Sequence, residues 1–175
     1  MKSGLLYSSH GESFSAKTLR YLEDSFAKSY QKSIAKNSTL PFLKIYNTDR
    51  TFIDRTFQEF AEDTEKVRRY LLAQYSDQEV IITVDSNTYE NLVFMTATIL
   101  AGFTLAPMSP TEGAERVLNK QKQINQKSVI FTGAKFQPQL PNATLLKIPD
   151  TQPADVKNKV RGEDVPPIII FTSGT

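Results

Sequence analysis

The chain has 175 residues, the length of one domain rather than two. Hydrophobic residues make up 39% of it and charged residues 23%, so the chain can bury a core and is not globally disordered. Lys plus Arg number 21 against 19 Asp plus Glu, and a net charge of +2 argues against binding to nucleic acid, which needs a strongly basic surface. There is no cysteine and a single histidine, His10, which excludes disulfides, thiol nucleophiles, zinc–thiolate sites and histidine-rich metal sites.

Two hydrophobicity features bear on location. Residues 1–15 are rich in serine and without periodicity, so we expect a flexible leader; they lack the apolar stretch of a signal peptide, which favours a cytosolic protein. Residues 92–107 are apolar for about sixteen residues, short of the roughly 20 that a membrane span requires. A buried helix followed by a buried strand is the favoured interpretation, and no membrane span is expected.

The first third of the sequence predicts a helix and a hairpin. Apolar residues recur every three or four positions over 17–35, the pattern of an amphipathic helix. Two short apolar segments, 42–46 and 51–53, then flank the polar residues 47–50, which predicts a short hairpin around a polar turn.

Three later segments begin with an N-cap residue that is followed three positions on by a glutamate. This spacing lets the two residues satisfy each other's free backbone N–H groups at a helix start. The first helix should end near Tyr75 or Ser76, the second should end at Gly102, and the third has Pro110 in its first turn. The three pairs are Thr56 with Glu59, Asn87 with Glu90, and Ser109 with Glu112.

Runs of β-branched and apolar residues alternate with these helices. Such runs are typical of strands that are covered on both faces. The polar, proline-punctuated residues 149–166 are expected to be a loop. The alternation predicts an α/β fold, a mostly parallel sheet with helices on both faces, preceded by an N-terminal helix and a short hairpin. The expected strands are 80–84, 104–108, 128–132, 143–148 and 167–172.

The last predicted strand runs into Thr172, Ser173, Gly174 and Thr175. Hydroxyl groups donate hydrogen bonds, and a glycine lets backbone N–H groups come close to an anion, so this sequence has the chemistry of a phosphate-binding loop. Four residues of this kind also occur at ordinary strand ends, so the wider context must distinguish the two interpretations.

That context is an ordered series of segments. TFIDRTFQEFAEDTEKVRRYLLA is followed by VIITVDSNTYENLVFMTATILAGFTLAPMSP, which contains Gly102, Pro107 and Pro110. ERVLNKQKQINQKSVIFTG and EDVPPIIIFTSGT come next. In this order the segments resemble the AMP-forming adenylating enzymes, the superfamily of acyl-CoA synthetases, peptide-synthetase adenylation domains and firefly-type luciferases. EDVPPIIIFTSGT resembles the start of that family's phosphate loop, T-S-G-T-T-G-x-P-K.

The resemblance implies a ligase that works in two steps. ATP and a carboxylic acid, a fatty acid or another acyl acid, would give an acyl-adenylate and pyrophosphate. The thiol of coenzyme A or of a carrier protein would then take the acyl group. By the same resemblance, Thr172, Ser173, Gly174 and Thr175 would line the ATP phosphates, with Mg²⁺ sharing the charge.

The resemblance also implies what the 175 residues lack. The lysine of the loop, the acid and adenine pockets, the magnesium-binding acid and the mobile C-terminal domain would all follow Thr175. Residues 16–175 are therefore expected to be an incomplete N-terminal subdomain of an AMP-binding domain, inactive alone, with no catalytic residue, no metal ligand and no bound cofactor. The stretch 108–116 is shorter than is usual in the family.

Two other readings of the chain remain open. The chain could be a non-catalytic, Rossmann-like nucleotide-binding or interaction module, or it could self-associate through uncovered apolar surface. Asp85, just after a predicted strand, could be a ligand residue, although capping of the next helix is favoured. A mild cationic patch is interpreted as ordinary surface; it consists of Lys120, Lys122 and Lys127.

Overall fold

The computed structural model describes residues 6–7, 13–14, 16–46, 51–151, 156–157, 159 and 167–171. Within the segment expected to be a flexible leader, the two short strands β1 (Leu6–Tyr7) and β2 (Ser13–Phe14) pair antiparallel. The rest of that segment lies outside the described residues.

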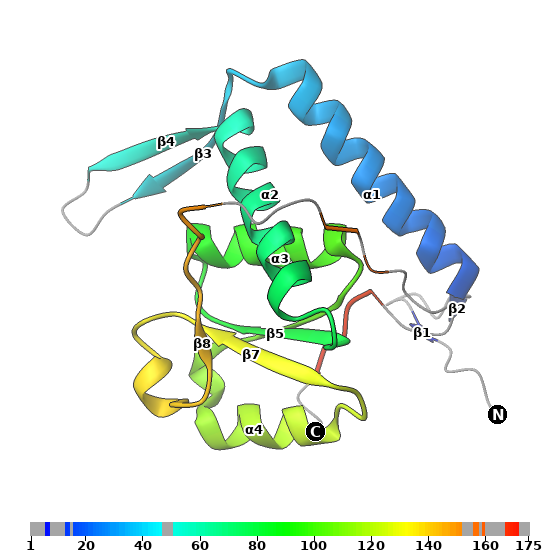
Figure 1. Ribbon diagram of the computed structural model, residues 1–175, viewed down its shortest axis with the longest axis vertical. Helices are drawn as coiled ribbons and strands as arrows, with labels where there is room; N and C mark the ends of the chain where they lie inside the picture. The colour runs from blue at the N-terminus through cyan, green and yellow to red at the C-terminus, as the bar shows by residue number, and fades with distance from the viewer. Residues whose placement is uncertain are drawn as a thin grey trace.

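The predicted N-terminal helix and hairpin are both confirmed. Helix α1 spans Ala16–Asn37, and strands β3 (Pro41–Tyr46) and β4 (Phe52–Thr56) form an antiparallel pair that projects from the body of the molecule (Figure 1). Strand β4 is longer than the predicted 51–53 because its pairing with β3 continues to Thr56, which lies opposite Pro41.

Helix α2 (Phe57–Gln74) begins with the predicted capping box. The Glu59 amide donates to the Thr56 hydroxyl (3.1 Å), and the Thr56 amide donates to the Glu59 carboxylate (2.8 Å). This second bond is the main reason why the pKa of Glu59 lies below its ordinary value. The capping box therefore fixes the point where β4 passes into α2.

A four-stranded parallel sheet forms the centre of the molecule, as predicted. Its strands are β5 (Val80–Val84), β6 (Thr104–Met108), β7 (Ser128–Thr132) and β8 (Thr144–Leu145), in the order β6-β5-β7-β8. Val80 lies opposite Thr104 on one side and Ser128 on the other, so the three long strands start and end at the same levels.

Helices cover both faces of this sheet (Figure 1). Helices α2 and α3 (Tyr89–Ala101) lie on one face, and α4 (Ala114–Gln123) lies on the other. All five residues of β5 are buried, and because side chains alternate along a strand, Ile81 joins the core with α2 and α3 while Ile82 joins the core with α4. The apolar run 92–107 is the buried end of α3 followed by β6, as expected. In the part of the chain that the structure describes, no helix is both long and apolar enough to cross a bilayer.

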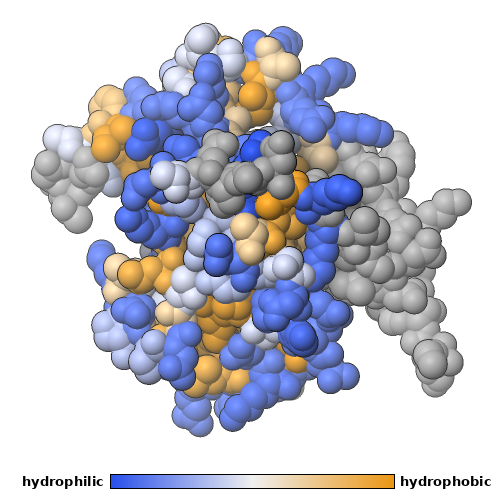
Figure 2. Space-filling model, in the orientation of Figure 1, coloured by the Kyte–Doolittle hydropathy of each residue, from blue (hydrophilic) through white to orange (hydrophobic). Residues whose placement is uncertain are grey.

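The surface view locates the exposed apolar residues. Figure 2 shows hydrophobic residues gathered on the projecting hairpin. Self-association through such surface stays a prediction. The exposed large residues of the hairpin are Phe42, Tyr46, Phe52 and Ile53.

Two predicted helix starts are wrong in detail. Thr88, not Asn87, is the N-cap of α3, because its hydroxyl accepts the hydrogen bond from the Asn91 amide. The segment that begins at Ser109 does not lead directly into α4; it forms the short 3-10 helix η1 (Pro110–Glu112), and α4 starts after Gly113. Gly113 has φ 78° and ψ 154°, which is incompatible with a continuous helix.

Two predicted strands at the sides of the sheet are much shorter than expected. The segment 143–148 forms only the two residues of β8, because Leu145 already pairs with Thr132, the last residue of β7. The segment 167–172 forms a single parallel bridge between Ile168 and Leu105 of β6. The next ladder bond would need an amide at position 107 of β6, and Pro107 has none. Thr172 itself lies outside the described residues.

Candidate functional site

The carboxyl ends of three parallel strands lie at one edge of the sheet. Val84 of β5 lies opposite Met108 of β6 and Thr132 of β7, so the residues that follow them, Asp85, Ser109 and Gly133, start the connecting loops at the same level. In open parallel sheets, ligands bind at this edge. It is the candidate functional site of the chain.

The segment 167–171 runs alongside β6 toward this same edge. The Leu105 amide donates to the Pro167 carbonyl (2.9 Å), and the Ile169 amide donates to the Leu105 carbonyl (2.8 Å), which sets a parallel register. The bridge between Ile168 and Leu105 is isolated, and no further bridge to β6 follows it in residues 169–171. The four predicted phosphate-binding residues, Thr172 to Thr175, lie outside the described residues.

Asp85 is engaged within its own loop. One carboxylate oxygen accepts the Ser86 amide (2.8 Å), and the other accepts the Thr88 hydroxyl (2.7 Å). The Asn91 side-chain amide donates to the Ser86 carbonyl (3.1 Å). The carboxylate therefore orders the β5–α3 loop and holds the hydroxyl of Thr88, which is the residue that caps α3. The favoured interpretation of Asp85, direct capping of the following helix, is wrong in detail, because Asp85 accepts from Ser86 and Thr88 and from no amide of α3.

Gly133 allows this carboxylate to lie over the end of β7. A β-carbon at position 133 would lie 2.4 Å from the nearer Asp85 carboxylate oxygen, far inside van der Waals contact. The Gly133 amide donates to the Val84 carbonyl (3.3 Å), so the glycine cannot easily move away from β5. The predicted end of the strand at Gly133 is thus also the point where two loops of the edge touch.

We expect Gly133→Ala to destabilise the chain by about 1–3 kcal/mol, because the added methyl group must displace the Asp85 carboxylate from its two donors. The check is urea unfolding of Gly133→Ala, Asp85→Ala and the double variant. In the Asp85→Ala background the clash is gone, and the alanine at 133 should cost less than about 1 kcal/mol. Equal costs of the alanine in both backgrounds would contradict the contact.

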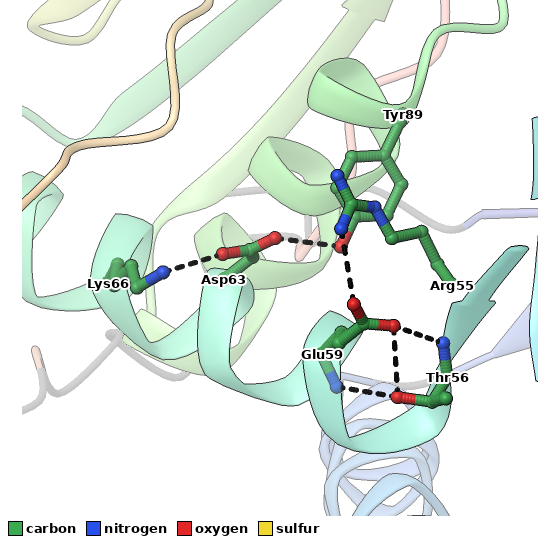
Figure 3. A network of polar contacts seen from close by, with 6 residues as sticks. All are labelled: Arg55, Thr56, Glu59, Asp63, Lys66 and Tyr89. Atoms are coloured by element: carbon green, nitrogen blue, oxygen red, sulfur yellow. Dashed lines mark hydrogen bonds and ion pairs between the residues drawn. The ribbon is translucent and has the colours of Figure 1, made fainter. Parts of the chain in front are cut away.

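A polar network next to the edge joins β4, α2 and α3 (Figure 3). Tyr89, the first residue of α3, donates its hydroxyl to Asp63 (2.9 Å), and Lys66 donates to the other oxygen of Asp63 (2.8 Å). The Arg55 guanidinium lies 5.3 Å from the centre of the Tyr89 ring and donates to Glu59 (3.2 Å).

This network is structural in character. Each charged side chain in it has an opposite charge as a partner, and burial, with the hydrogen bond to Asp63, raises the pKa of Tyr89, so its phenol keeps its proton. The network has no signature in the sequence, because Asp63 and Tyr89 are 26 positions apart and no local spacing connects them. In the described ranges, no three His, Asp or Glu side chains gather as a possible metal site.

The three lysines of the predicted cationic patch differ in their surroundings. Lys122 and Lys127 are exposed. Lys120 is half-buried and forms an ion pair with Glu112 of η1.

Comparison with known proteins gives matches by structure. No protein-family model matches the chain, and no curated protein sequence matches it significantly. Solved structures of AMP-forming enzymes do match. A nonribosomal peptide synthetase structure matches with a TM-score of 0.66 at 15% identity over 82% of this chain.

Two coenzyme A ligases match in the same way. An acyl-CoA synthetase from Brucella canis matches with a TM-score of 0.58 at 15% identity over 77% of this chain. The O-succinylbenzoate coenzyme A synthetase from Bacillus subtilis, solved with AMP, matches with a TM-score of 0.63 at 15% identity over 83% of this chain.

These matches establish the fold. The described chain has the architecture of part of the N-terminal domain of adenylating enzymes, which confirms the fold and the structural resemblance expected from the sequence. The chain spans 16%, 29% and 39% of the lengths of these three structures, in the order given.

Proposed function

We propose that this chain is the N-terminal part of an ATP-dependent acid–thiol ligase, which joins a carboxylic acid to AMP and then passes the acyl group to a thiol. The observation that carries the proposal is the segment 167–171. At residues 167–169 it runs parallel to β6, in the direction of the edge that Asp85, Ser109 and Gly133 share, and the four residues after Phe171 are Thr-Ser-Gly-Thr. The fold of the solved AMP-forming enzymes supports the same proposal.

In this proposal, Thr172 to Thr175 bind the phosphates of ATP. The hydroxyl groups of Thr172, Ser173 and Thr175 and the local backbone amides donate to phosphate oxygens, and Gly174 leaves room for the backbone to approach. The parallel contact of 167–169 with β6 supports this role, because it sets the direction of the chain before the loop, and a loop with a set direction can hold the triphosphate in one orientation.

The reaction requires that the triphosphate of ATP be held in a fixed position. A carboxylate oxygen of the acid attacks the α-phosphorus, a new carboxyl O–P bond forms, and the bond from the α-phosphorus to pyrophosphate breaks. Negative charge develops on the pyrophosphate, so fixed donors at its oxygens lower the barrier. Magnesium would come with ATP and share that charge. The acyl-adenylate then gives its acyl group to the thiol of coenzyme A or of a carrier protein, and AMP leaves.

The test is carboxylate-dependent exchange between ATP and labelled pyrophosphate, measured on the longest natural polypeptide that contains these residues. Fatty, aromatic and amino acids are offered separately. We expect exchange with one class of acid, and a loss of about tenfold or more in the double variant Thr172→Val, Ser173→Ala. Ser76→Ala is the matched control, because Ser76 is exposed beyond the opposite edge of the sheet.

Two outcomes would overturn the proposal. Saturable binding of ATP without exchange for any acid would indicate the alternative, a non-catalytic nucleotide-binding module. Exchange that is unaffected by the double variant would show that Thr172 and Ser173 do not hold the phosphates.

A further inference from the structure

Three side chains meet at the last described residue before the proposed phosphate loop. The Lys120 ammonium of α4 lies 5.1 Å from the centre of the Phe171 ring, and it also forms an ion pair with Glu112 of η1. The side chains of Lys120 and Glu112 are only 15% and 21% exposed. The cluster therefore links α4 and η1 to the residue that immediately precedes Thr172.

The surroundings strengthen the contact with Phe171. Both Ile169 and Phe171 pack against the core beneath the sheet, whereas Ile170 is 74% exposed. A cation over an aromatic ring gains more when water is largely excluded. Glu112 supplies the opposite charge that a half-buried ammonium needs. It is itself held in η1, where its amide donates to the Ser109 carbonyl (3.2 Å) at the edge of the sheet.

The backbone gives Phe171 less support than it gives Ile169. In the described part of the segment, the last backbone bond to β6 is the one from Ile169 to Leu105. Pro107 cannot donate the next one, since it has no N–H. At the point where the ladder stops, the side chain of Lys120 holds the segment instead.

We propose that Lys120, braced by Glu112, is a positioning residue that fixes Phe171 and thereby the start of the phosphate loop. The role in ATP binding rests on the proposed function. The contacts of Lys120 with Phe171 and Glu112 do not depend on it. Lys120 does not touch the reacting atoms in this proposal. It acts on how well ATP is held, and not on the chemical step.

The first measurement tests the contact between Lys120 and Phe171 and does not depend on enzymatic activity. In NMR spectra of the chain, the Lys120 side-chain protons should be shifted by the Phe171 ring current, and Phe171→Leu should remove the shift. Lys120→Met should speed exchange of the Ile169 amide about three- to tenfold at unchanged global stability. Lys120→Arg, which keeps a cation that stacks on rings, should restore protection. Lys122→Met is the matched control, an exposed lysine on the same helix.

The second measurement tests the role of Lys120 in the exchange between ATP and pyrophosphate. Lys120→Met should raise the KM for ATP about three- to tenfold with kcat changed less than about twofold. Adding Lys120→Met to Phe171→Leu should have no further effect, because the lysine acts through the ring. Glu112→Gln should give a smaller change in the same direction.

The outcomes separate the two proposals. Absence of pyrophosphate exchange in the parent protein would overturn the proposed function, while the ring-current shift and amide exchange would still decide the contact. If Lys120→Met behaves like Lys122→Met in amide exchange, or lowers kcat and leaves the KM for ATP unchanged, the positioning role is wrong.

Discussion

Replacing Gly102 with alanine is expected to lower the free energy of unfolding by about 2–5 kcal/mol. Two causes add together. Gly102 ends α3 with φ 87° and ψ 15°, a left-handed conformation that costs a residue with a side chain about 1–2 kcal/mol. A β-carbon there would also lie 2.1 Å from the backbone oxygen of Lys159, and overpacking of this kind costs about 1–3 kcal/mol.

The Lys159 backbone is not free to move aside. Its amide donates to the Ala101 carbonyl (2.9 Å), and its ammonium donates to the Ser76 carbonyl (3.2 Å) and to the Gln78 carbonyl. The ammonium also lies 5.1 Å from the centre of the Phe103 ring. Lys159 is thus bound to residues at the amino edge of the sheet, and the alanine must break these contacts or distort the end of α3.

Gly113→Ala is the matched control for this prediction. Gly113 also has a positive φ, 78°, but a β-carbon there would meet nothing within 4 Å. This variant should show only the backbone strain, about 1–3 kcal/mol. Urea unfolding of both variants separates the two causes. A loss at Gly102 of no more than about 1–2 kcal/mol, the cost of its backbone conformation alone, would show that the contact with Lys159 contributes nothing.

Phe131→Ala is expected to cost about 3–5 kcal/mol, the range for emptying a fully enclosed phenylalanine site. The Phe131 side chain on β7 has no exposed surface, and its ring lies between those of Phe94 (5.1 Å) and Tyr75 (5.2 Å). Neighbours on α3 and α2 are held by their own helices, so they cannot collapse into the space.

The control for Phe131 is Phe52→Ala on the projecting hairpin. Phe52 is 49% exposed, although its ring lies beneath the Lys44 ammonium (3.9 Å). Its loss should cost less than about 1 kcal/mol. Thermal and urea unfolding of the two variants give the comparison, and a Phe131→Ala loss as small as that of Phe52→Ala would mean that the core between α2, α3 and the sheet is not packed as described.

The central strands could be predicted from the sequence residue for residue. The segments 80–84, 104–108 and 128–132 are short runs of apolar and β-branched residues, and each is followed by a polar residue or a glycine that stops it. Because helical segments connect these strands, a parallel sheet is the expected topology. Local pattern was sufficient here because the strands are covered on both faces.

The sides of the sheet could not be predicted in this way. The segments 143–148 and 167–172 have the composition of strands, but strand length there depends on the neighbour. Strand β7 ends at Thr132 and leaves β8 two residues long, while Pro107 interrupts the ladder on β6. The strand propensity of a segment does not show where its partner strand ends.

The candidate site could be predicted in part from the sequence. Composition and resemblance indicate Thr172 to Thr175, and the structure adds that the chain runs parallel to β6 at 167–169, shortly before them. The contacts of Lys120 with Phe171 and of Lys159 with Gly102 join segments more than 50 positions apart. Neither has a sequence signature, because only the folded sheet brings these segments together.

Whether Thr172 to Thr175 reach the carboxyl edge of the sheet can be measured directly. The chain has no cysteine, so a single nitroxide can be attached at Thr111→Cys in η1, beside that edge, or at Asp77→Cys, just before β5 at the opposite edge. The label at 111 should strongly broaden the Gly174 amide resonance, and the label at 77 should leave it sharp. Broadening from position 77, or from neither position, would contradict a phosphate loop at the carboxyl edge.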